Sequence, residues 1–577
     1  HVTFHHRDDL NAVQKEFMNV KGTSVLIYDQ TCAAEKRRRR KRGKYPDPDQ
    51  RIVINELVCE GCGDCGVQSN CVAIVPVETE YGRKRAIDQS SCNKDFSCLK
   101  GFCPSFVTVH GARRHEPSTG IDFTLPAITP PELMDGFAML ITGVGGTGVV
   151  TIGAILAMAA HLEGKGAGVI DMAGLAQKGG PVTSHVRIAP TPSSIKAIRI
   201  AAGGADTVLA CDMVVAGSAR SLAAIRPNRT RVFVNTHETY PGEFTRDPDM
   251  RLPKERLLAA ISGRAGAAHT RAIEATETAT ALLGDAIATN MFMLGLAWQS
   301  GAIPVTAAAI ERAIELNGVD VDMNKAAFAW GRRAAVEPDK VAAAARRRSG
   351  REEAAPETVD ALVERRARFL AAYQDEAYAR RYSAAVNRIR EAEQRIAPGS
   401  DALARAVAVN LFRLMAIKDE YEVARLYADG SFETQLRREF ASWGKLEFHL
   451  APPILARLDP ATGRPAKARY GSWMRRGFRV LSAMRRLRGT VLDPFRHSAD
   501  RKLERRLLAD YEETLSLIAI HLRADNHLAA AALAEYPEKI RGYGPIKAES
   551  AAKATALATE REGAFLAGAP RLAEAAE

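Results

Sequence analysis

Seven of the nine cysteines in this chain of 577 residues lie in one short stretch, between Cys59 and Cys103. A disulfide-stabilised secreted domain is short and carries cysteines along its whole length. Here only Cys32 and Cys211 lie outside the stretch. The distribution therefore predicts a metal site in a protein of a reducing compartment, and we expect a cytoplasmic location.

The first half of the stretch places three cysteines in succession with two residues between neighbours, in the order Cys59, Cys62 and Cys65. Thiolates at this spacing can hold one face of an iron–sulfur cubane, because each pair of intervening residues forms a tight turn. The neighbouring glycines let the backbone approach closely; they are Gly61, Gly63 and Gly66. In two-cluster ferredoxins the fourth cysteine of such a run binds the other cluster, which assigns Cys71 to a second site.

The second half of the stretch looks one ligand short until Asp95 is considered. It reads Cys92-x2-Asp95-x2-Cys98, with aspartate where the usual run has its middle cysteine, and it ends at Cys103-Pro104. A carboxylate is a harder iron ligand than a thiolate and holds iron less firmly. We therefore predict one 4Fe–4S cluster and a second site that is a 4Fe–4S cluster, a 3Fe–4S form or vacant. The first ligand set is Cys59, Cys62, Cys65 and Cys103, and the second is Cys71, Cys92, Cys98 and Asp95.

Zinc is the alternative to iron in this stretch. Zinc modules place paired Cys-x2-Cys knuckles well apart and use four ligands for each ion. Three x2-spaced cysteines followed much later by Cys103-Pro104 favour an iron–sulfur cluster at the first set. For the second set the spacing leaves both metals open. We interpret Cys32 and Cys211 as ordinary packed thiols.

A glycine-rich loop follows the apolar run 138–142 and opens an apolar helix through Met158; its residues are Gly143, Gly145, Gly146, Thr147 and Gly148. A strand, a glycine turn and a helix N-terminus together suit a phosphate or dinucleotide. Asp171 ends the next apolar run, where an acid that binds a ribose would lie. The alternative is a tight junction between strand and helix that binds no ligand.

A second loop, at 177–187, combines small residues, a base and hydroxyls, which is typical of a binding surface. We predict that this loop contributes to cofactor binding through Lys178, Gly179, Gly180 and Ser184. His185 is either a catalytic residue or a core histidine with satisfied hydrogen bonds. Asn290 and Asn317 are either ligand contacts or helix caps. No catalytic residue is assigned.

The length and a composition of 46% hydrophobic and 26% charged residues indicate a soluble protein of several domains. Apolar runs alternate with helical patterns and predict a parallel, doubly wound sheet with strands at 138–142, 168–171, 207–209, 213–215 and 231–235. Helical periodicity dominates from about residue 345, as at 403–415 and 503–522, with one short strand at 446–450.

The predicted fold class is multidomain α/β plus α. It comprises a ferredoxin-like module at 46–112, a linker at 113–135, a Rossmann-like α/β domain at 136–340 and a helical domain at 341–577. Residues 1–45 hold one helix–strand unit, with the strand at 23–28, and a basic linker. We interpret this unit as the tail of a larger domain, and the chain as part of a longer or processed polypeptide.

Hydropathy and charge indicate whether the chain could contact a membrane, a nucleic acid or an acidic protein. The segment between Asp135 and Glu163 has no charged residue and is long enough to span a bilayer, but its many glycines favour a buried strand, turn and helix. The formal net charge of +12 is partly concentrated in the run from Lys36 to Arg42. That run has no interleaved aromatic residues, so we expect it to be solvated or to bind an acidic protein rather than a nucleic acid.

Together these residues resemble the indolepyruvate:ferredoxin oxidoreductase family, within the 2-oxoacid:ferredoxin oxidoreductases, in the C-terminal half of its long single-chain bacterial form. The resemblance covers essentially the whole chain, and the cysteine stretch is its most specific part. It is carried by Leu26 to Lys36 with the basic run, Cys59-Glu-Gly-Cys62-Gly-Asp-Cys65, Asp88 to Cys98 continuing to Phe106, Gly143 to Gly148, Lys178 to His185, Leu487 to Phe495 and Ile540 to Gly544.

The resemblance implies oxidative decarboxylation of a 2-oxoacid such as indolepyruvate, with transfer of the acyl group to coenzyme A. Thiamine diphosphate with Mg²⁺ carries that chemistry, and electrons pass through 4Fe–4S clusters to ferredoxin. The region 136–340 resembles the family's gamma domain, residues 1–45 the end of a thiamine-binding domain, and the C-terminal region a helical domain of unknown function. A homodimer is expected by family analogy.

The family's Gly-Asp-Gly motif with a downstream Asn, which holds the magnesium diphosphate, is not found in this sequence; Gly284-Asp285-Ala286 is not that motif. We therefore expect this segment to carry electrons and to help bind coenzyme A, but not to decarboxylate. Two other functions stay open. One is an NAD(P)-linked iron–sulfur reductase that uses the glycine loop and Asp171, and the other is a zinc-containing nucleic-acid-binding module.

Overall fold

The computed structural model describes residues 2–117, 123–134, 136–174, 179–350, 357–452, 456 and 465–568. The chain divides into two compact units, His1–Pro48 and Asp49–Glu577. The first unit contains a short 3-10 helix, η1 (Arg7–Asp9), and the helices α1 (Leu10–Phe17) and α2 (Ala33–Lys41). Three parts of the second unit are named below the cysteine module (49–112), the α/β region (136–349) and the helical region (357–568).

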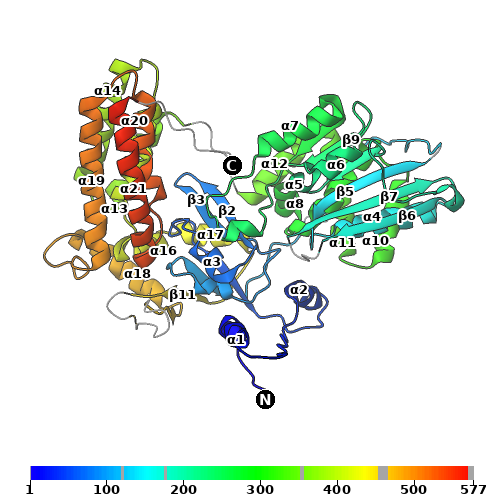
Figure 1. The fold of residues 1–577 in the computed structure, drawn as a ribbon, viewed down its shortest axis with the longest axis horizontal. Coiled ribbons are helices and arrows are strands. Elements are labelled where there is room, and N and C mark those ends of the chain that lie inside the picture. The colour runs from blue at the N-terminus through cyan, green and yellow to red at the C-terminus, as the bar shows by residue number, and fades with distance from the viewer. Residues whose placement is uncertain are drawn as a thin grey trace. The chain divides into compact units, whose positions relative to one another are not determined.

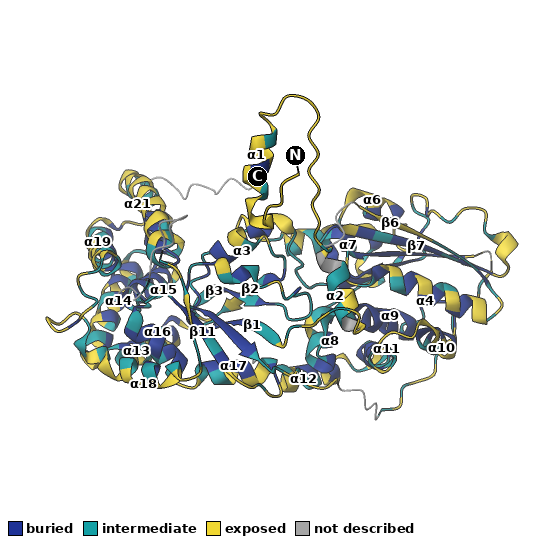
Figure 2. Ribbon diagram, turned by 90° about the horizontal axis from the view of Figure 1, so that it is seen from below, coloured by how far each residue is buried: buried dark blue, intermediate teal, exposed yellow. Residues whose placement is uncertain are grey.

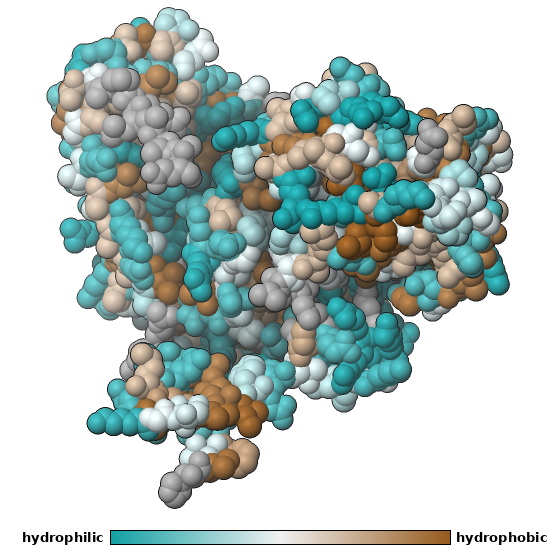
Figure 3. Space-filling view, turned by 45° about the vertical axis from the view of Figure 1, so that its right-hand side comes forward, coloured by the Kyte–Doolittle hydropathy of each residue, from teal (hydrophilic) through white to brown (hydrophobic). Residues whose placement is uncertain are grey.

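Two predictions for the first unit are wrong. Residues 23–28 form no strand, because a strand needs a hydrogen-bonded partner and none is present among the described residues. Side chains such as Val25 and Ile27 remain 74% and 86% exposed, and Figure 3 shows apolar groups on this unit's surface. The basic run is helical rather than a linker, with Glu35 paired to Arg38 and Arg39 at 3.4 and 3.0 Å.

The cysteine module is built on short strands that leave the cysteines in connecting segments. In chain order it contains β1 (Gln50–Ile54), α3 (Asp64–Ser69), β2 (Ile74–Thr79), β3 (Gly82–Ile87), η2 (Ser97–Lys100) and β4 (Phe106–His110). β1 pairs antiparallel with β4, and β2 with β3. The first and last strands thus bring the two halves of the cysteine stretch together.

The strand predicted at 446–450 is confirmed as β11 (Leu446–Leu450), but its neighbour lies far away in the sequence. β11 pairs antiparallel with β4 and with β12 (Ala468–Tyr470), which gives a four-stranded sheet in the order β1-β4-β11-β12. Apolar side chains of the module, Val53, Val107 and Val109, share a core with Leu446 and Phe448. The helical region and the cysteine module therefore share one sheet.

The α/β region contains a six-stranded sheet in the order β10-β9-β8-β5-β7-β6. Its strands are β5 (Phe137–Val144), β6 (Gly166–Ala173), β7 (Pro181–Ala189), β8 (Thr207–Ala210), β9 (Arg231–Asn235) and β10 (Thr270–Ile273). Four strands are parallel neighbours, whereas β7 runs antiparallel to both β5 and β6. The predicted all-parallel sheet is therefore mixed.

Residues 213–215 were predicted as a strand but lie in a helix, α5 (Met213–Ala216). The backbone N–H of Val215 donates to Oδ1 of Asp212 at 2.8 Å, so the aspartate caps the helix N-terminus. A run of four apolar residues suits a buried helical turn as well as a strand, and the cap decides between them.

Helices cover both faces of the six-stranded sheet (Figure 1). One layer contains α4 (Val149–Leu162), α8 (Ala275–Leu283), α9 (Thr289–Gln299), α10 (Ala307–Asn317) and α11 (Val321–Val336). The other contains α5, α6 (Ala219–Ala224) and α7 (Lys254–Ala265). α9 is buried along its whole length (Figure 2). It packs tightly on α11, because a Cβ at Gly295 would lie only 2.0 Å from the carbonyl oxygen of Phe328.

After α12 (Pro338–Ser349) the chain is mainly helical, as predicted. The helices are α13 (Val359–Tyr373), α14 (Glu376–Ile396), α15 (Ala402–Met415), α16 (Glu420–Ala428), α17 (Ser431–Glu439), α18 (Met474–Ala483), α19 (Ala499–His521), α20 (His527–Ala534) and α21 (Gly544–Ala567). The helices predicted at 403–415 and 503–522 are confirmed as α15 and α19. Among the described helices, none is both long and apolar enough to cross a membrane.

Candidate functional site: two groups of buried thiols

The structure brings the residues of the first predicted ligand set together. Cys59, Cys65 and Cys103 are less than one-tenth exposed and pack in one core cluster. Burial, followed by the charges of Cys103 and Cys59, raises the pKa of Cys62. Burial also raises the pKa of Cys65, and the charges of Cys103, Cys59 and Cys62 add to this shift. The four thiols are therefore close enough to affect one another's ionisation.

The residues of the second predicted set also lie together. Burial, then Cys92, Cys71 and Asp95 in that order, raises the pKa of Cys98. Cys98 itself is 7% exposed, and Cys71 and Cys92 are partly buried against the same core cluster. The members of each predicted set thus lie close together, while their role as metal ligands stays a prediction.

Glycines allow the backbone to fold closely around the first set. Gly61 has φ +70°, and a Cβ there would lie 2.2 Å from the carbonyl oxygen of Arg83. A Cβ at Gly101 would lie 2.9 Å from Cα of Cys65. The N–H of Gly61 donates to Sγ of Cys59 at 3.3 Å, the type of amide–sulfur contact that surrounds iron–sulfur clusters.

The loop around Asp95 has an unusual backbone. Lys94 and Phe96 on either side have φ of 51° and 61°, the left-handed region that non-glycine residues rarely adopt. Asp95 Oδ1 accepts hydrogen bonds from the backbone N–H and the hydroxyl of Ser97, at 3.3 and 3.1 Å. Strain of this kind is commonly retained at functional sites.

The donor chemistry of both sets fits an iron–sulfur cluster. Burial raises the pKa of the Cys62, Cys65 and Cys98 thiols, and a bound metal offsets this cost because it deprotonates its thiol ligands. Among the described residues, no group of three or more His, Cys, Asp or Glu side chains is arranged to hold a metal ion.

Two cations near the thiols were not found from the sequence. Lys467, next to β12, has its pKa lowered by burial, while Cys103, Cys98 and Cys65 oppose that shift. Its ammonium group donates to the carbonyl of Gly101 and lies 4.8 Å from the ring centre of Phe106. Arg85 is 2% exposed and interacts electrostatically with Cys59 and Cys65. A lysine more than 360 residues from the first cysteines offers no local signal of its position.

The two predicted cofactor loops of the α/β region contact each other. The N–H of Gly145 donates to the carbonyl of Gly180 at 2.7 Å, and the N–H of Gly179 to the carbonyl of Gly145 at 3.4 Å. Gly146 and Thr147 are exposed, and Gly148 with φ +97° begins α4. Lys178 lies outside the described residues. The loops thus form one continuous backbone surface at the N-terminus of α4.

Other residues of these motifs are held in the core. A Cβ at Gly143 would lie 2.4 Å from Cγ2 of Val149, so this glycine permits close packing of strand and helix. Ser184 is fully buried in β7, and its Oγ would lie 2.6 Å from a Cβ at Gly153 of α4. These contacts give Gly143 and Ser184 packing roles in the structure.

The polar residues for which the sequence left both a functional and a structural role open make contacts within the fold. His185 is 6% exposed, and its Nδ1 accepts a hydrogen bond from the N–H of Ile200 at 3.1 Å, as expected of a core histidine. Asn290 donates from Nδ2 to the carbonyl of Thr147 at 2.9 Å and so holds the glycine loop. Asn317 is exposed at the end of α10. Asp285 caps η6 (Ala286–Ala288) by accepting from the N–H of Ile287.

Asp171 does not lie where a dinucleotide fold would need it. In such a fold the strand with the ribose-binding acid neighbours the strand before the glycine loop. Here β7 lies between β5 and β6, and Asp171 pairs with Ser184, which in turn pairs with Ile141. With strands about 4.8 Å apart, the aspartate backbone is roughly 10 Å from β5. This arrangement counts against the NAD(P)-linked alternative.

Comparison with known families assigns two parts of the chain. Residues 138–334 match the family described as pyruvate ferredoxin/flavodoxin oxidoreductase. Residues 359–560 match a family of unknown function, DUF6537. The first match covers the sheet and both glycine-containing loops, and the second covers most of the helical region.

Curated relatives match about a third of the chain. The indolepyruvate oxidoreductase subunit IorB of Methanothermobacter thermautotrophicus is 29% identical over 203 residues, which are 35% of this chain and 98% of the relative. The subunit of the same name from Archaeoglobus fulgidus is 28% identical over 195 residues, 33% of this chain and 92% of the relative.

Similar solved structures include the pyruvate oxidoreductase subunit PORC of Thermotoga maritima. It has 23% identity and a TM-score of 0.25, with 34% of this chain and 94% of that chain covered. The 2-oxoglutarate:ferredoxin oxidoreductase of Magnetococcus marinus has 17% identity and a TM-score of 0.26, with 35% of this chain and 31% of that chain covered.

The family match and the curated relatives agree on the class of enzyme. The pyruvate ferredoxin/flavodoxin oxidoreductase match at residues 138–334 and these curated relatives support membership of this chain in the 2-oxoacid:ferredoxin oxidoreductase family.

Proposed function

We propose that this chain is the electron-transfer and gamma portion of an indolepyruvate-type 2-oxoacid:ferredoxin oxidoreductase. The observation that carries the proposal is the presence of two neighbouring groups of buried thiols in the same chain as the family's oxidoreductase domain. The relatives named as indolepyruvate oxidoreductase subunits support the substrate type.

In this proposal Cys59, Cys62, Cys65 and Cys103 hold a 4Fe–4S cluster, and Cys71, Cys92, Cys98 and Asp95 hold a second cluster of the 4Fe–4S or 3Fe–4S type. A bound cluster supplies one-electron transfer. The chain's own contribution is to exclude water from the thiols, to direct amides at sulfur and to place cations such as Arg85 and Lys467 nearby.

The overall reaction that we propose is oxidative decarboxylation of the 2-oxoacid to an acyl-CoA, with ferredoxin as electron acceptor. Thiamine diphosphate and Mg²⁺ would be bound by domains outside this sequence, since the sequence has no Gly-Asp-Gly motif of the family type. We further propose a cytoplasmic homodimer. The exposed Arg38 and Arg39 of α2 suit an acidic ferredoxin, because opposite charges speed association.

The cluster assignment is tested by iron and sulfide analysis with EPR on anaerobically prepared protein, before and after dithionite. We expect about seven to eight iron atoms and two signals, one from a cubane and one from a second cubane or a 3Fe form. In Asp95→Cys, thiolate replaces the more labile carboxylate, so we expect a full second cubane and a changed EPR line shape.

Cys32→Ser is the matched control, because Cys32 belongs to neither set, and it should leave iron content unchanged. About four iron atoms would remove the role of the second set, while zinc without iron would overturn the redox proposal. An unchanged iron content and line shape in Asp95→Cys would contradict the assignment of Asp95 as a ligand.

We propose that the joined loops at Gly145 and Gly179–Gly180 contribute to coenzyme A binding. The exposed Gly146 and Thr147 at the start of α4 support this, because the N-terminus of a helix attracts phosphate. In Gly145→Val the branched side chain obstructs this surface, and calorimetric titration with coenzyme A should show a loss of binding.

Gly263→Val provides the control, since a Cβ at Gly263 of α7 meets no atom within 4 Å. It should bind coenzyme A like the unaltered protein. Equal affinity in Gly145→Val and Gly263→Val would leave the loop with a purely structural role.

A further inference from the structure

A small cavity lies between the cysteine module and the helical region, beside the backbone of Cys59. It has a volume of about 50 Å³ and is lined by residues of the module, such as Glu60 and Lys84, and of α13 and α15, such as Arg366 and Arg413. One water needs roughly 10–15 Å³ by the same measure, so the cavity has room for a few non-hydrogen atoms but not for a nucleotide.

The charged lining of this cavity is strongly positive. It consists of one carboxylate and four cations, namely Glu60, Lys84, Lys418, Arg366 and Arg413. Glu60 already pairs with Lys418 at 2.7 Å. The single carboxylate of the lining is therefore already paired with one lysine.

The two arginines are held largely by backbone and rings. Arg366 donates to the carbonyl of Glu80 at 3.0 Å and lies 4.4 Å from the ring centre of Phe412. Arg413 donates to the carbonyl of Glu538 at 2.9 Å. Neither contact supplies a negative charge, so the charge of both guanidinium groups is uncompensated by these partners.

Lys84 is the most informative member of the lining. Its side chain is 5% exposed, and its ammonium group has no hydrogen-bond or ion-pair partner among the residues that the structure describes. An unpaired buried charge is costly. Burial, then Lys418, lowers the pKa of Lys84 to about 7, while Glu60 opposes that shift. A bound anion would satisfy the ammonium group and neutralise part of the lining.

We propose that this cavity binds a small oxyanion, either a phosphate-type ion or a small carboxylate, with Lys84 as its main partner and Arg366 and Arg413 as supporting charges. The cavity size limits the ligand to a few heavy atoms, and the excess of cations selects negative charge. This site goes beyond the proposed electron transfer and does not depend on which metal the thiols hold.

The test uses the full chain and follows thermal unfolding in sodium phosphate, sodium formate, sodium acetate or sodium chloride at equal ionic strength. An anion that binds only the folded protein raises the unfolding midpoint as its concentration rises. We expect phosphate, or formate and acetate, to raise the midpoint above its value in chloride. A response to phosphate alone identifies a phosphate site, and a response to the carboxylates alone identifies a carboxylate site.

Lys84→Met removes the charge and keeps most of the side-chain volume, and it should weaken the binding anion about tenfold to a hundredfold. Lys553→Met is the matched control, because Lys553 is exposed on α21 and pairs only with Glu549 among the described residues. It should respond to the anions like the unaltered protein. An equal response of Lys84→Met and Lys553→Met would overturn the proposal.

Should Lys84→Met fail to fold, calorimetric titration of the unaltered chain with phosphate, formate and acetate decides the question. Saturable binding of one of these anions at one site per chain supports the cavity site. Absence of saturable binding of all three, or equal effects of all salts including chloride, overturns it.

Discussion

The imidazole of His449 shows how one buried side chain can make stability depend on pH. It lies in β11, is 5% exposed, and its Nε2 is 2.7 Å from Oγ1 of Thr108 in β4. Burial, then Lys467 and Arg469, lowers its pKa from 6.5 to about 4, and Glu447 opposes the shift. The folded protein therefore keeps this histidine neutral where an unfolded chain would protonate it.

The pKa of His449 is lower in the folded protein than in the unfolded chain. Neutral His449 therefore contributes to the free energy of unfolding above pH 6.5, and this contribution is lost as the pH falls toward 4. The loss is about 3 kcal/mol of unfolding free energy. In His449→Gln this pH dependence of the unfolding free energy should disappear. Urea unfolding at a series of pH values measures it. His161→Gln, at an exposed position of α4, should keep it, and identical pH profiles for all three proteins would contradict the prediction.

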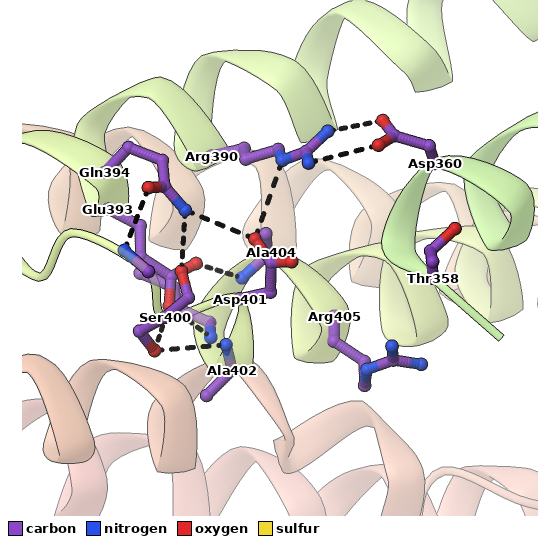
Figure 4. A network of polar contacts seen from close by, with 12 residues as sticks. Thr358, Asp360, Arg390, Glu393, Gln394, Ser400, Asp401, Ala402, Ala404 and Arg405 are labelled. Atoms are coloured by element: carbon purple, nitrogen blue, oxygen red, sulfur yellow. Dashed lines mark hydrogen bonds and ion pairs between the residues drawn. The ribbon is translucent and has the colours of Figure 1, made fainter. Parts of the chain in front are cut away.

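At the level of elements, the buried carboxylate of Glu393 links α14 to the start of α15 (Figure 4) and also contacts α20. It lies near the end of α14, is fully buried, and accepts hydrogen bonds from the N–H groups of Leu403 and Ala404 at 2.9 and 2.8 Å. His527 at the start of α20 contacts the same carboxylate at 2.7 Å. A carboxylate at the N-terminus of α15 also interacts favourably with the helix dipole.

Glu393→Ala should lower the free energy of unfolding by about 3–5 kcal/mol, because it leaves two helix N–H groups and His527 without their buried partner. Chemical denaturation followed by circular dichroism measures the effect. Glu391→Ala, two residues away and exposed, should change the free energy of unfolding by less than about 0.5 kcal/mol. Equal stability of the two variants would show that the network in Figure 4 contributes little.

At the scale of the second unit, segments that the sequence separates are joined around the thiols. β11 of the helical region extends the sheet of the cysteine module. From the α/β region, Tyr240 and the carbonyl of Met250 accept hydrogen bonds from Arg83 at 2.6 and 2.7 Å. The helical region thus helps to enclose the cysteines, which gives the family of unknown function at 359–560 a structural role here.

Local patterns were sufficient for several features of this protein. The x2 spacing of the cysteines predicts two ligand sets, and the members of each set lie close together in space. The strand, glycine turn and helix at 137–162 form as expected, since the glycines permit both the turn and the packing. The long helices α15 and α19 follow from their apolar periodicity.

Other features required the tertiary structure, because strand partners and buried charges are chosen by contacts between distant segments. The sequence does not indicate that β7 inserts between β5 and β6, that β11 pairs with β4, or that residues 23–28 have no partner. It also gives no sign that Lys84 meets Arg366 in one cavity. Spacing and periodicity act over a few residues, so they were sufficient to predict the helices and the grouping of the neighbouring cysteines. Long-range pairing determined the sheet order and the cavity, since its free energy depends on surfaces that exist only once the chain has folded.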